Sequence, residues 1–300
     1  MSNLLPQATT PIVAPMSSAG PVFYEDSFES DKFSIYQLLN LSAMRQQQSL
    51  QERQGYFEEL VRLLESNLTA LQPMAFQWEV KGQTYESTSL LFELYMTTVA
   101  LGEELLRNQT YYKEAHATFL HAEAILASWK TSELVYPACP YVCTGEYVKN
   151  MMLITKGSQL LHDLRSGDRR GVALSSAMKF NGQVSFHLPE WSDVALNHYL
   201  SSRALLYFDL SQKDKENVDQ GDRANASYTA AKEALEICRL IDRSKCHMNE
   251  ALDNELNRVL EEAPEHMQSM QQVFYAVDAP LQNIKIPASL KNDSVQARES

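Results

Sequence analysis

The chain has 300 residues, of which 44% are hydrophobic, and it carries a formal net charge of −12. Its 10 glycines and 11 prolines are too few for a turn-rich, all-β architecture. The negative charge disfavours nucleic acid as a partner, because that binding depends on neutralising phosphates with basic side chains. It also disfavours docking on an anionic membrane through a basic patch, and it fits a basic or amphipathic protein partner better.

The cysteines form no recognisable metal motif. Cys139 and Cys143 are separated by three residues, and Cys246 precedes His247, whereas a zinc knuckle usually has two residues between its cysteines. We therefore expect reduced thiols and no metal. No signal peptide is visible at the start of the chain, and the longest apolar run, about 13 residues over 89–101, is too short to span a bilayer. These features predict a cytoplasmic protein without a transmembrane segment.

The first part of the chain predicts a leader, two helices and an extended segment. Residues 1–29 are rich in Ser, Thr, Pro and Ala and lack periodicity, which indicates a flexible leader. A Ser-Asp step at 30–31 can cap a helix that continues to Leu41. Apolar residues recur every three or four positions over 56–68 and predict a second helix. Alternating side chains over 73–80 favour a short extended segment.

The segment 87–129 predicts an antiparallel helical hairpin at the centre of the fold. Its first half is apolar almost all round, so a helix there must be enclosed by its neighbours. Its second half carries Ala115, Phe119 and Ala122, a spacing in which two small residues admit a neighbouring helix around one aromatic side chain. The same spacing occurs in the second helix of tetratricopeptide-type repeats. A polar break at 107–110 joins the two halves.

Further helices follow the hairpin. Residues 131–146 contain two prolines and predict a loop. Helix is predicted to resume at Tyr147 and to stop at Gly167, a common helix-ending residue. Residues 168–188 are ambiguous between helix and turn. Small Ala residues set against aromatic residues over 189–242 predict a second helical hairpin.

The end of the chain predicts one more helix and an extended segment. The helix covers roughly 246–270 and is interrupted by Pro264. Residues 273–287 look extended and packed, and residues 289–300 are polar and predict a disordered tail. The sequence thus predicts a mainly all-α fold, with one helical domain over 30–288 built of antiparallel helical pairs and a small β element.

The sequence carries no recognisable catalytic constellation. Glycine-rich phosphate loops, a G-x-S-x-G nucleophile elbow and an H-E-x-x-H motif are absent. Carboxylate pairs such as Glu103 and Glu104 are adjacent, so their side chains diverge on a helix. His116 and His121 are five residues apart and form neither a ligand pair nor a catalytic dyad. We expect no enzyme, no cofactor and no metal. A buried cluster of charged residues or histidines around a cavity would indicate a helical-bundle enzyme instead.

Several stretches, taken together and in order, resemble a known family. They are the aromatic segment 75–80 followed by a buried helix with Leu90, Leu91, Phe92 and Glu93, the helix with Ala115, Phe119 and Ala122, the segment 151–159, the stretch Asn197-His198-Tyr199 with Ala204 and the helix at 230–231, and the segment 273–281. The collinear set resembles the Bro domain, the Alix-like family of helical scaffolds in the endosomal sorting (ESCRT) pathway. The resemblance covers about residues 30 to 290.

This resemblance implies a curved helical body with a tetratricopeptide-like core, whose concave face binds the amphipathic C-terminal helix of an ESCRT-III subunit. By motif position, the hydrophobic binding patch would use Leu160 or Leu161, followed by Val172 and Ala177. Tyr275 lies where the family has a tyrosine that can be phosphorylated. The chain would then be a non-enzymatic cytoplasmic adaptor that is recruited to endosomal membranes.

Two alternatives compete with these implications. Ordinary core packing explains Leu160 and Leu161 equally well, because every helix of a bundle needs an apolar stripe. A helical-repeat interaction or structural protein with an unrelated partner would share the same architecture. A strand over 73–80 packed beside 273–281 would favour the Bro-like fold over regular repeats.

Overall fold

The computed structural model describes residues 16–28, 33–46, 49–66, 74–108, 110–129, 134–136, 140–164, 169–184, 191–213, 221–245 and 250–276. The chain forms two compact units. The first unit takes Met1–Asp163, Lys179–His198 and Asp242–Asn249, and the second takes Leu164–Met178, Tyr199–Ile241 and Glu250–Ser300. A single domain with the limits 30 and 288 stays a prediction.

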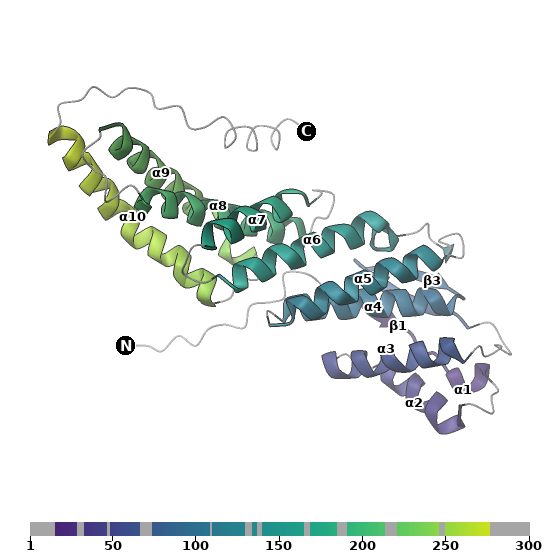
Figure 1. The fold of residues 1–300 in the computed structure, drawn as a ribbon. Helices are drawn as coiled ribbons and strands as arrows, with labels where there is room; N and C mark the ends of the chain where they lie inside the picture. Colours follow the sequence, from purple (N-terminus) through teal and green to yellow (C-terminus); the bar gives the residue numbers. More distant parts are fainter. Residues whose placement is uncertain are drawn as a thin grey trace, which may run out of the picture. The chain divides into compact units, whose positions relative to one another are not determined.

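The described helices and strands follow one another as Figure 1 shows. In chain order they are β1 (Ser17–Ala19), α1 (Tyr24–Ser27), α2 (Ile35–Arg45), α3 (Leu50–Glu65), β2 (Phe76–Val80), β3 (Gln83–Ser87), α4 (Leu90–Arg107), α5 (Tyr112–Ser128), β4 (Leu134–Tyr136), α6 (Gly145–His162), α7 (Arg170–Gly182), α8 (Trp191–Lys213), α9 (Gly221–Leu240) and α10 (Glu250–Ala276). A short 3-10 turn, η2 (Tyr141–Cys143), precedes α6, and another, η4 (Arg243–Lys245), precedes α10. The fold is therefore mainly all-α with a small β element, as predicted.

Among the described residues, four strands form an antiparallel sheet in the order β1-β2-β3-β4. The alternation in β2 places the side chains of Phe76, Trp78 and Val80 in the core. A two-residue turn joins β2 to β3, and both of its residues, Lys81 and Gly82, have positive φ angles of 55° and 74°. Two positive φ angles are typical of the hairpin turn whose twist matches the flanking strands. The predicted extended segment is confirmed.

The predicted central hairpin is confirmed as α4 and α5. Nearly every residue of α4 is buried, as expected for a helix whose side chains are apolar almost all round. Ala115, Phe119 and Ala122 have no exposed surface and form the contact between the two helices. The ring of Phe119 packs so closely on Gly102 of α4 that a Cβ at this glycine would lie 2.9 Å from the ring. Helix α3 packs against α4, and α6 packs against α5, so consecutive helices are neighbours.

The segment predicted as a flexible leader is partly ordered. Residues 16–28 carry β1, which pairs with β2, and α1, whose Tyr24 is fully buried. The guanidinium of Arg45 donates a hydrogen bond of 2.6 Å to the carbonyl of Gly20 and fixes this segment on α2. The local sequence has no periodic pattern that predicts these short elements, because the segments that stabilise them lie far along the chain. The rest of the predicted leader, 1–15 and 29, lies outside the described residues.

The C-terminal helix differs from the prediction. Helix α10 continues through Pro264 to Ala276, so residues 273–276 are helical and not extended. Its buried positions keep helical spacing on both sides of the proline, namely Leu252, Leu256, Val259, Ala263, His266 and Met270. This continuous stripe packs along α9, and the packing outweighs the hydrogen bond that proline cannot donate. Strand β2 pairs with β1 and β3, and the packing of 73–80 beside 273–281 stays a prediction, because residues 277–281 lie outside the described residues.

Smaller differences concern helix starts and loops. Helix α2 is capped by Ser34, whose side chain accepts from the amide of Gln37, instead of by the step at 30–31, which lies outside the described residues. The predicted loop over 131–146 contains β4 and the turn η2. The ambiguous segment 168–188 contains helix α7. The predicted tail, 289–300, also lies outside the described residues.

Candidate partner-binding surface

The predicted binding residues differ sharply in exposure. Leu161 on α6 is 2% exposed and Ala177 on α7 is fully buried, so both side chains belong to the interior. Leu160 on α6 is half-buried, and Val172 on α7 is 68% exposed. Leu160 belongs to the first unit and Val172 to the second. Of the four predicted binding residues, only Leu160 and Val172 have side chains that are available to a partner.

Helix α6 presents one continuous face to solvent. Its exposed and half-buried residues recur every three or four positions and include Lys149, Met152, Leu153, Lys156 and Leu160. The opposite side of the helix is buried, which is the pattern of a helix that covers a core. Two lysines thus alternate along the helix with three apolar side chains that are only partly covered.

Helix α5 extends this face from the side. It packs against α6 in the antiparallel direction, with the rings of Tyr112 and His162 5.5 Å apart in an edge-on contact. One turn further, His116 lies near Lys156, so Leu120 reaches the level of Leu153. Leu120 is 47% exposed, which is high for a leucine. We call the six residues Leu120, Lys149, Met152, Leu153, Lys156 and Leu160 the α5–α6 face.

The charge of this face comes from the lysines alone. Burial, together with the neighbouring charge of Lys156, lowers the pKa of His116 below its ordinary value. The imidazole is therefore neutral at physiological pH. Its Nε2 atom is buried and has no hydrogen-bond partner among the described residues. The six residues of the face thus carry two lysine charges, on a chain whose net charge is negative.

Buried contacts beneath the face hold α6 in place. The side chain of Thr144 caps the helix by accepting from the amide of Tyr147. Gly157 allows the Asn181 side chain to approach so closely that a Cβ would lie 2.3 Å from it. Next to it, the buried hydroxyl of Ser158 hydrogen-bonds His198 Nδ1 at 3.0 Å. The polar residues on the inner side of α6 therefore orient the helix, while its outer side is left to solvent.

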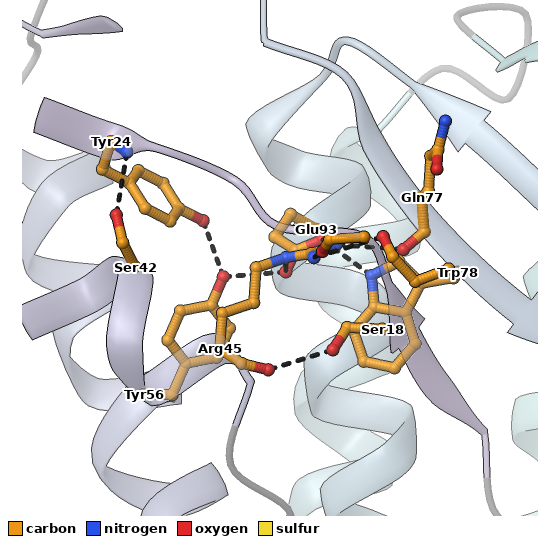
Figure 2. A network of polar contacts seen from close by, with 10 residues as sticks. Ser18, Tyr24, Ser42, Arg45, Tyr56, Gln77, Trp78 and Glu93 are labelled. Carbon is orange, nitrogen blue, oxygen red and sulfur yellow. Dashed lines mark hydrogen bonds and ion pairs between the residues drawn. The ribbon is translucent and has the colours of Figure 1, made fainter. Parts of the chain in front are cut away.

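A second polar cluster lies deep in the first unit, around Glu93. Its carboxylate accepts from Arg45 Nε at 2.8 Å, from the Tyr56 hydroxyl at 2.7 Å and from Trp78 Nε1 at 2.7 Å. Because Tyr56 donates to Glu93, the hydroxyl of Tyr24 donates in turn to Tyr56 at 2.6 Å. Figure 2 shows Arg45 of α2, Tyr56 of α3 and Trp78 of β2 around the Glu93 carboxylate, with Tyr24 of α1 bonded to Tyr56.

The electrostatics of this cluster follow from burial. Burial, and then the charge of Glu93, raise the pKa values of Tyr24 and Tyr56 well above their usual range. Burial alone would lower the pKa of Arg45, but the adjacent Glu93 raises it above its ordinary value. The tyrosines are therefore neutral donors, and the arginine is held in its charged form beside the glutamate, 2.8 Å away.

The Glu93 cluster has no room for a substrate. The cavity beside it has a volume of about 10 Å³ and is lined by residues that include Arg45, Tyr56 and Trp78. That volume holds about one water molecule. A buried charged cluster around a cavity would indicate an enzyme. Here the charged side chains of Arg45 and Glu93 pair with each other, and the cavity beside them is too small for a substrate.

The described residues offer neither a metal site nor a membrane-spanning helix. No group of three or more His, Cys, Asp or Glu side chains among them could hold a metal ion. None of the helices in the described ranges is long and apolar enough to cross a membrane.

Solved structures identify the fold. No family model matches the chain, and no curated protein matches its sequence. The structure titled "ALIX BRO1 CHMP4C complex" matches with a TM-score of 0.55 and 14% sequence identity, over 93% of this chain and 94% of that chain. The structure titled "Structure basis for endosomal targeting by the Bro1 domain" has a TM-score of 0.48 and 12% identity, over 95% and 94%. The chain therefore has a Bro domain-like fold.

One residue of the α5–α6 face, Leu160, was expected from the sequence to bind a partner, and that role stays a prediction. Leu160 was predicted from its motif position, whereas Leu120, Leu153 and the two lysines were not. The spacing of three and four residues along α6 is visible in the sequence and could have included Leu153. Leu120 could not be found that way, because its place on the face depends on how α5 packs against α6.

Proposed function

We propose that this chain is a non-enzymatic binding scaffold whose α5–α6 face receives an amphipathic helix of an ESCRT-III subunit. The observation that carries the proposal is the row of half-buried apolar side chains Met152, Leu153 and Leu160 on the outer side of α6, next to the exposed Leu120. The Bro domain-like fold supports the same assignment, because the matched Alix structure is a complex with CHMP4C.

The chemistry of the face favours a helical ligand with two kinds of side chain. Apolar anchors spaced three and four residues apart would cover the leucines, as in other complexes of a helix in a groove. Met152 can adjust its shape to such anchors, because its side chain is unbranched and flexible. Lys149 and Lys156 lie seven residues apart on the same stripe of α6, among the apolar side chains, and favour acidic residues between the anchors of the ligand.

The cellular setting follows from the same proposal. An adaptor for an ESCRT-III subunit works on the cytoplasmic side of endosomal membranes, and it reaches them through its partner. A positive charge on the face alone is too small to anchor the protein to lipid, given the net charge of −12.

Val172 of the second unit is proposed as a separate apolar anchor, since its side chain is largely exposed.

The proposal is tested by titrating a labelled peptide of the C-terminal CHMP4C helix with the full chain and following fluorescence anisotropy. Leu153→Asp and Leu160→Asp should each weaken binding roughly tenfold or more, because a charge replaces an apolar anchor. Leu39→Asp is the matched control, since Leu39 is an exposed leucine on α2, away from the face. Equal loss in all three variants, or no binding by the wild-type chain, would reject the proposal. The same titration with Val172→Asp measures whether Val172 contributes.

A further inference from the structure

Helix α2 presents an exposed apolar face that is distinct from the α5–α6 face. Ile35 is 61% exposed, Tyr36 is 79% exposed and Leu39 is 44% exposed. Asn40 and Ala43, further along the same side of the helix, are exposed as well. A single exposed leucine is ordinary, whereas several large apolar side chains gathered on one side of a helix mark an interaction surface. We call these five residues the α2 face.

The α2 face is held in place from the opposite side of the helix. A capping box at Ser34 fixes the first turn. Leu38 and Leu41 are buried beneath the helix, and Arg45 in the last turn forms the buried ion pair with Glu93. Both ends of the helix are therefore fixed, so a partner that docks on the face loses little free energy in ordering it.

The α2 face carries no charge at neutral pH. Arg45 is the only charged side chain of α2, and its charge is paired with Glu93 in the interior. Glu25 of α1 approaches the helix at Ser42, which donates to it at 2.7 Å and is not part of the face. The whole chain has a net charge of −12, so two copies repel each other over most of their surface. At a neutral apolar face they can meet without that repulsion.

The shape of the α2 face is complementary to itself. Ile35, Leu39 and Ala43 are four residues apart and form one row along the helix, with the smallest side chain at its C-terminal end. In a two-fold contact, residue i of one copy meets residue j of the other, and j meets i. With the axis at Leu39, two antiparallel helices place the bulky Ile35 of each copy over the small Ala43 of the other. The row therefore fits a second copy of the chain.

We propose that the α2 face joins two copies of this chain, with their α2 helices antiparallel about a two-fold axis at Leu39. Helix α2 has 11 residues, so a contact of this size is smaller than the interfaces of stable complexes, which bury about 1,200–2,000 Å². The dimer is therefore weak and reversible. The proposal does not depend on the function proposed for the α5–α6 face.

The test is sedimentation velocity of the full chain from about 1 μM to about 1 mM, the concentration range of weak complexes. The wild-type chain should shift reversibly from monomer to dimer within this range. Leu39→Asp and Leu39→Lys should each weaken self-association at least about tenfold, because two like charges then meet at the axis. Position 39 is exposed, and circular dichroism checks that both variants are folded.

A mixture of the two variants tests the symmetry of the contact. Leu39→Asp and Leu39→Lys in equal amounts should form a mixed dimer, because position 39 of one copy faces position 39 of the other and the charges are then opposite. Leu240→Asp is the matched control, since Leu240 is an exposed leucine at the end of α9 and should leave the dimer unchanged. A photo-crosslinking amino acid at position 39 should likewise join two copies into a product of twice the chain's mass.

Three outcomes would overturn the proposal. One is a wild-type chain that stays monomeric over the whole range. Another is self-association that Leu39→Asp leaves unchanged, or that Leu240→Asp weakens as strongly. The third is a mixture of the two charged variants that stays monomeric where the wild type dimerises. A monomeric chain that binds neutral phosphatidylcholine vesicles, and loses that binding in Leu39→Asp, would assign the α2 face to a lipid surface instead.

Discussion

Glu93 shows how much of the first unit depends on one side chain. Its carboxylate joins Arg45 of α2, Tyr56 of α3 and Trp78 of β2 to helix α4, and Arg45 also donates to the carbonyls of Gly20 and Gln77. The side chains of Arg45 and Glu93 are both fully buried. Removing one partner of such a pair leaves an uncompensated charge in the interior.

We therefore predict that Glu93→Gln destabilises the protein by about 3 kcal/mol, since broken buried ion pairs typically cost about that much. Glu59→Gln is the matched control, because Glu59 pairs with the exposed Arg62 and should cost less than about 1 kcal/mol. Urea unfolding of both variants measures the difference. Similar midpoints for the two would contradict the structural role given to Glu93.

A second prediction concerns alkaline pH. Burial, followed by the charge of Glu93 or Glu103, raises the pKa values of Tyr24, Tyr56 and Tyr147 well above 10.0. In the unfolded chain these tyrosines lose their protons near pH 10. Their contribution to stability is therefore complete below about pH 10 and is lost as the pH rises through the folded pKa values.

The free energy of unfolding should thus fall steeply above about pH 10, and tyrosinate absorbance should appear together with loss of helical circular dichroism. If all tyrosines lose their protons while the helical circular dichroism persists, the claim that buried, protonated tyrosines stabilise the fold is contradicted.

At this scale, the sequence could suggest residue types but not partners. Arg45 and Glu93 are separated by 48 positions, and no local pattern links them. Leu160 and Leu161 were equivalent candidates in the sequence, and only the rotation of α6 separates the half-buried residue from the buried one. The rotation of a helix about its axis is set by its packing against neighbouring helices, so it cannot be predicted from the sequence of that helix alone.

Among the elements, α10 shows tertiary packing overriding a local signal. Pro264 lies exposed in the middle of a helix whose apolar stripe continues on both sides. The intrinsic penalty for proline inside a helix is about 3 kcal/mol. Burial along α9 offsets that penalty.

Pro264→Ala should therefore stabilise the protein, by about 1–3 kcal/mol, because alanine restores the missing N–H donor without altering the buried stripe. Thermal unfolding followed by circular dichroism measures the gain. A lower melting temperature in this variant would mean that the proline shapes a bend on which the packing depends.

The α4–α5 hairpin gives an independent prediction about glycine. Gly102→Ala should destabilise the protein by about 1–3 kcal/mol, because its methyl group would lie 2.9 Å from the Phe119 ring. Gly171 in α7 has open space at the position of a Cβ, so Gly171→Ala should instead stabilise by about 0.5–1 kcal/mol. We therefore expect the two substitutions to change the free energy of unfolding, measured with urea, in opposite directions. Destabilisation by both substitutions would show that helix propensity and space do not explain these sites.

Helices and strands with a strong periodic pattern were predicted reliably from the sequence. The hairpin over 87–129 and the extended segment before it were predicted because their patterns extend over many residues. The ordered part of the leader was missed, because β1 has three residues and is stabilised by pairing with Glu79, Trp78 and Gln77 far along the chain. Short elements of this kind depend on their partners more than on their own sequence.

At the scale of the whole molecule, the sequence predicted the fold class and the order of the helices, and its motifs led to the Bro domain-like fold that the matched structure shows. The surface could be predicted only in part. A fold match at 14% identity indicates where the helices lie, whereas the proposed binding face depends on which side chains α5 and α6 leave uncovered. The α5–α6 face is therefore the point at which the account must be tested.

The most direct test is contact between this face and the proposed ligand. A photo-crosslinking amino acid in place of Leu120 is irradiated in the presence of the C-terminal CHMP4C peptide, with the same amino acid in place of Leu39 as the control. The account predicts a crosslinked product from position 120 that an excess of unlabelled peptide abolishes, and none from position 39. A peptide that binds but crosslinks equally at both positions, or at position 39 alone, would contradict it.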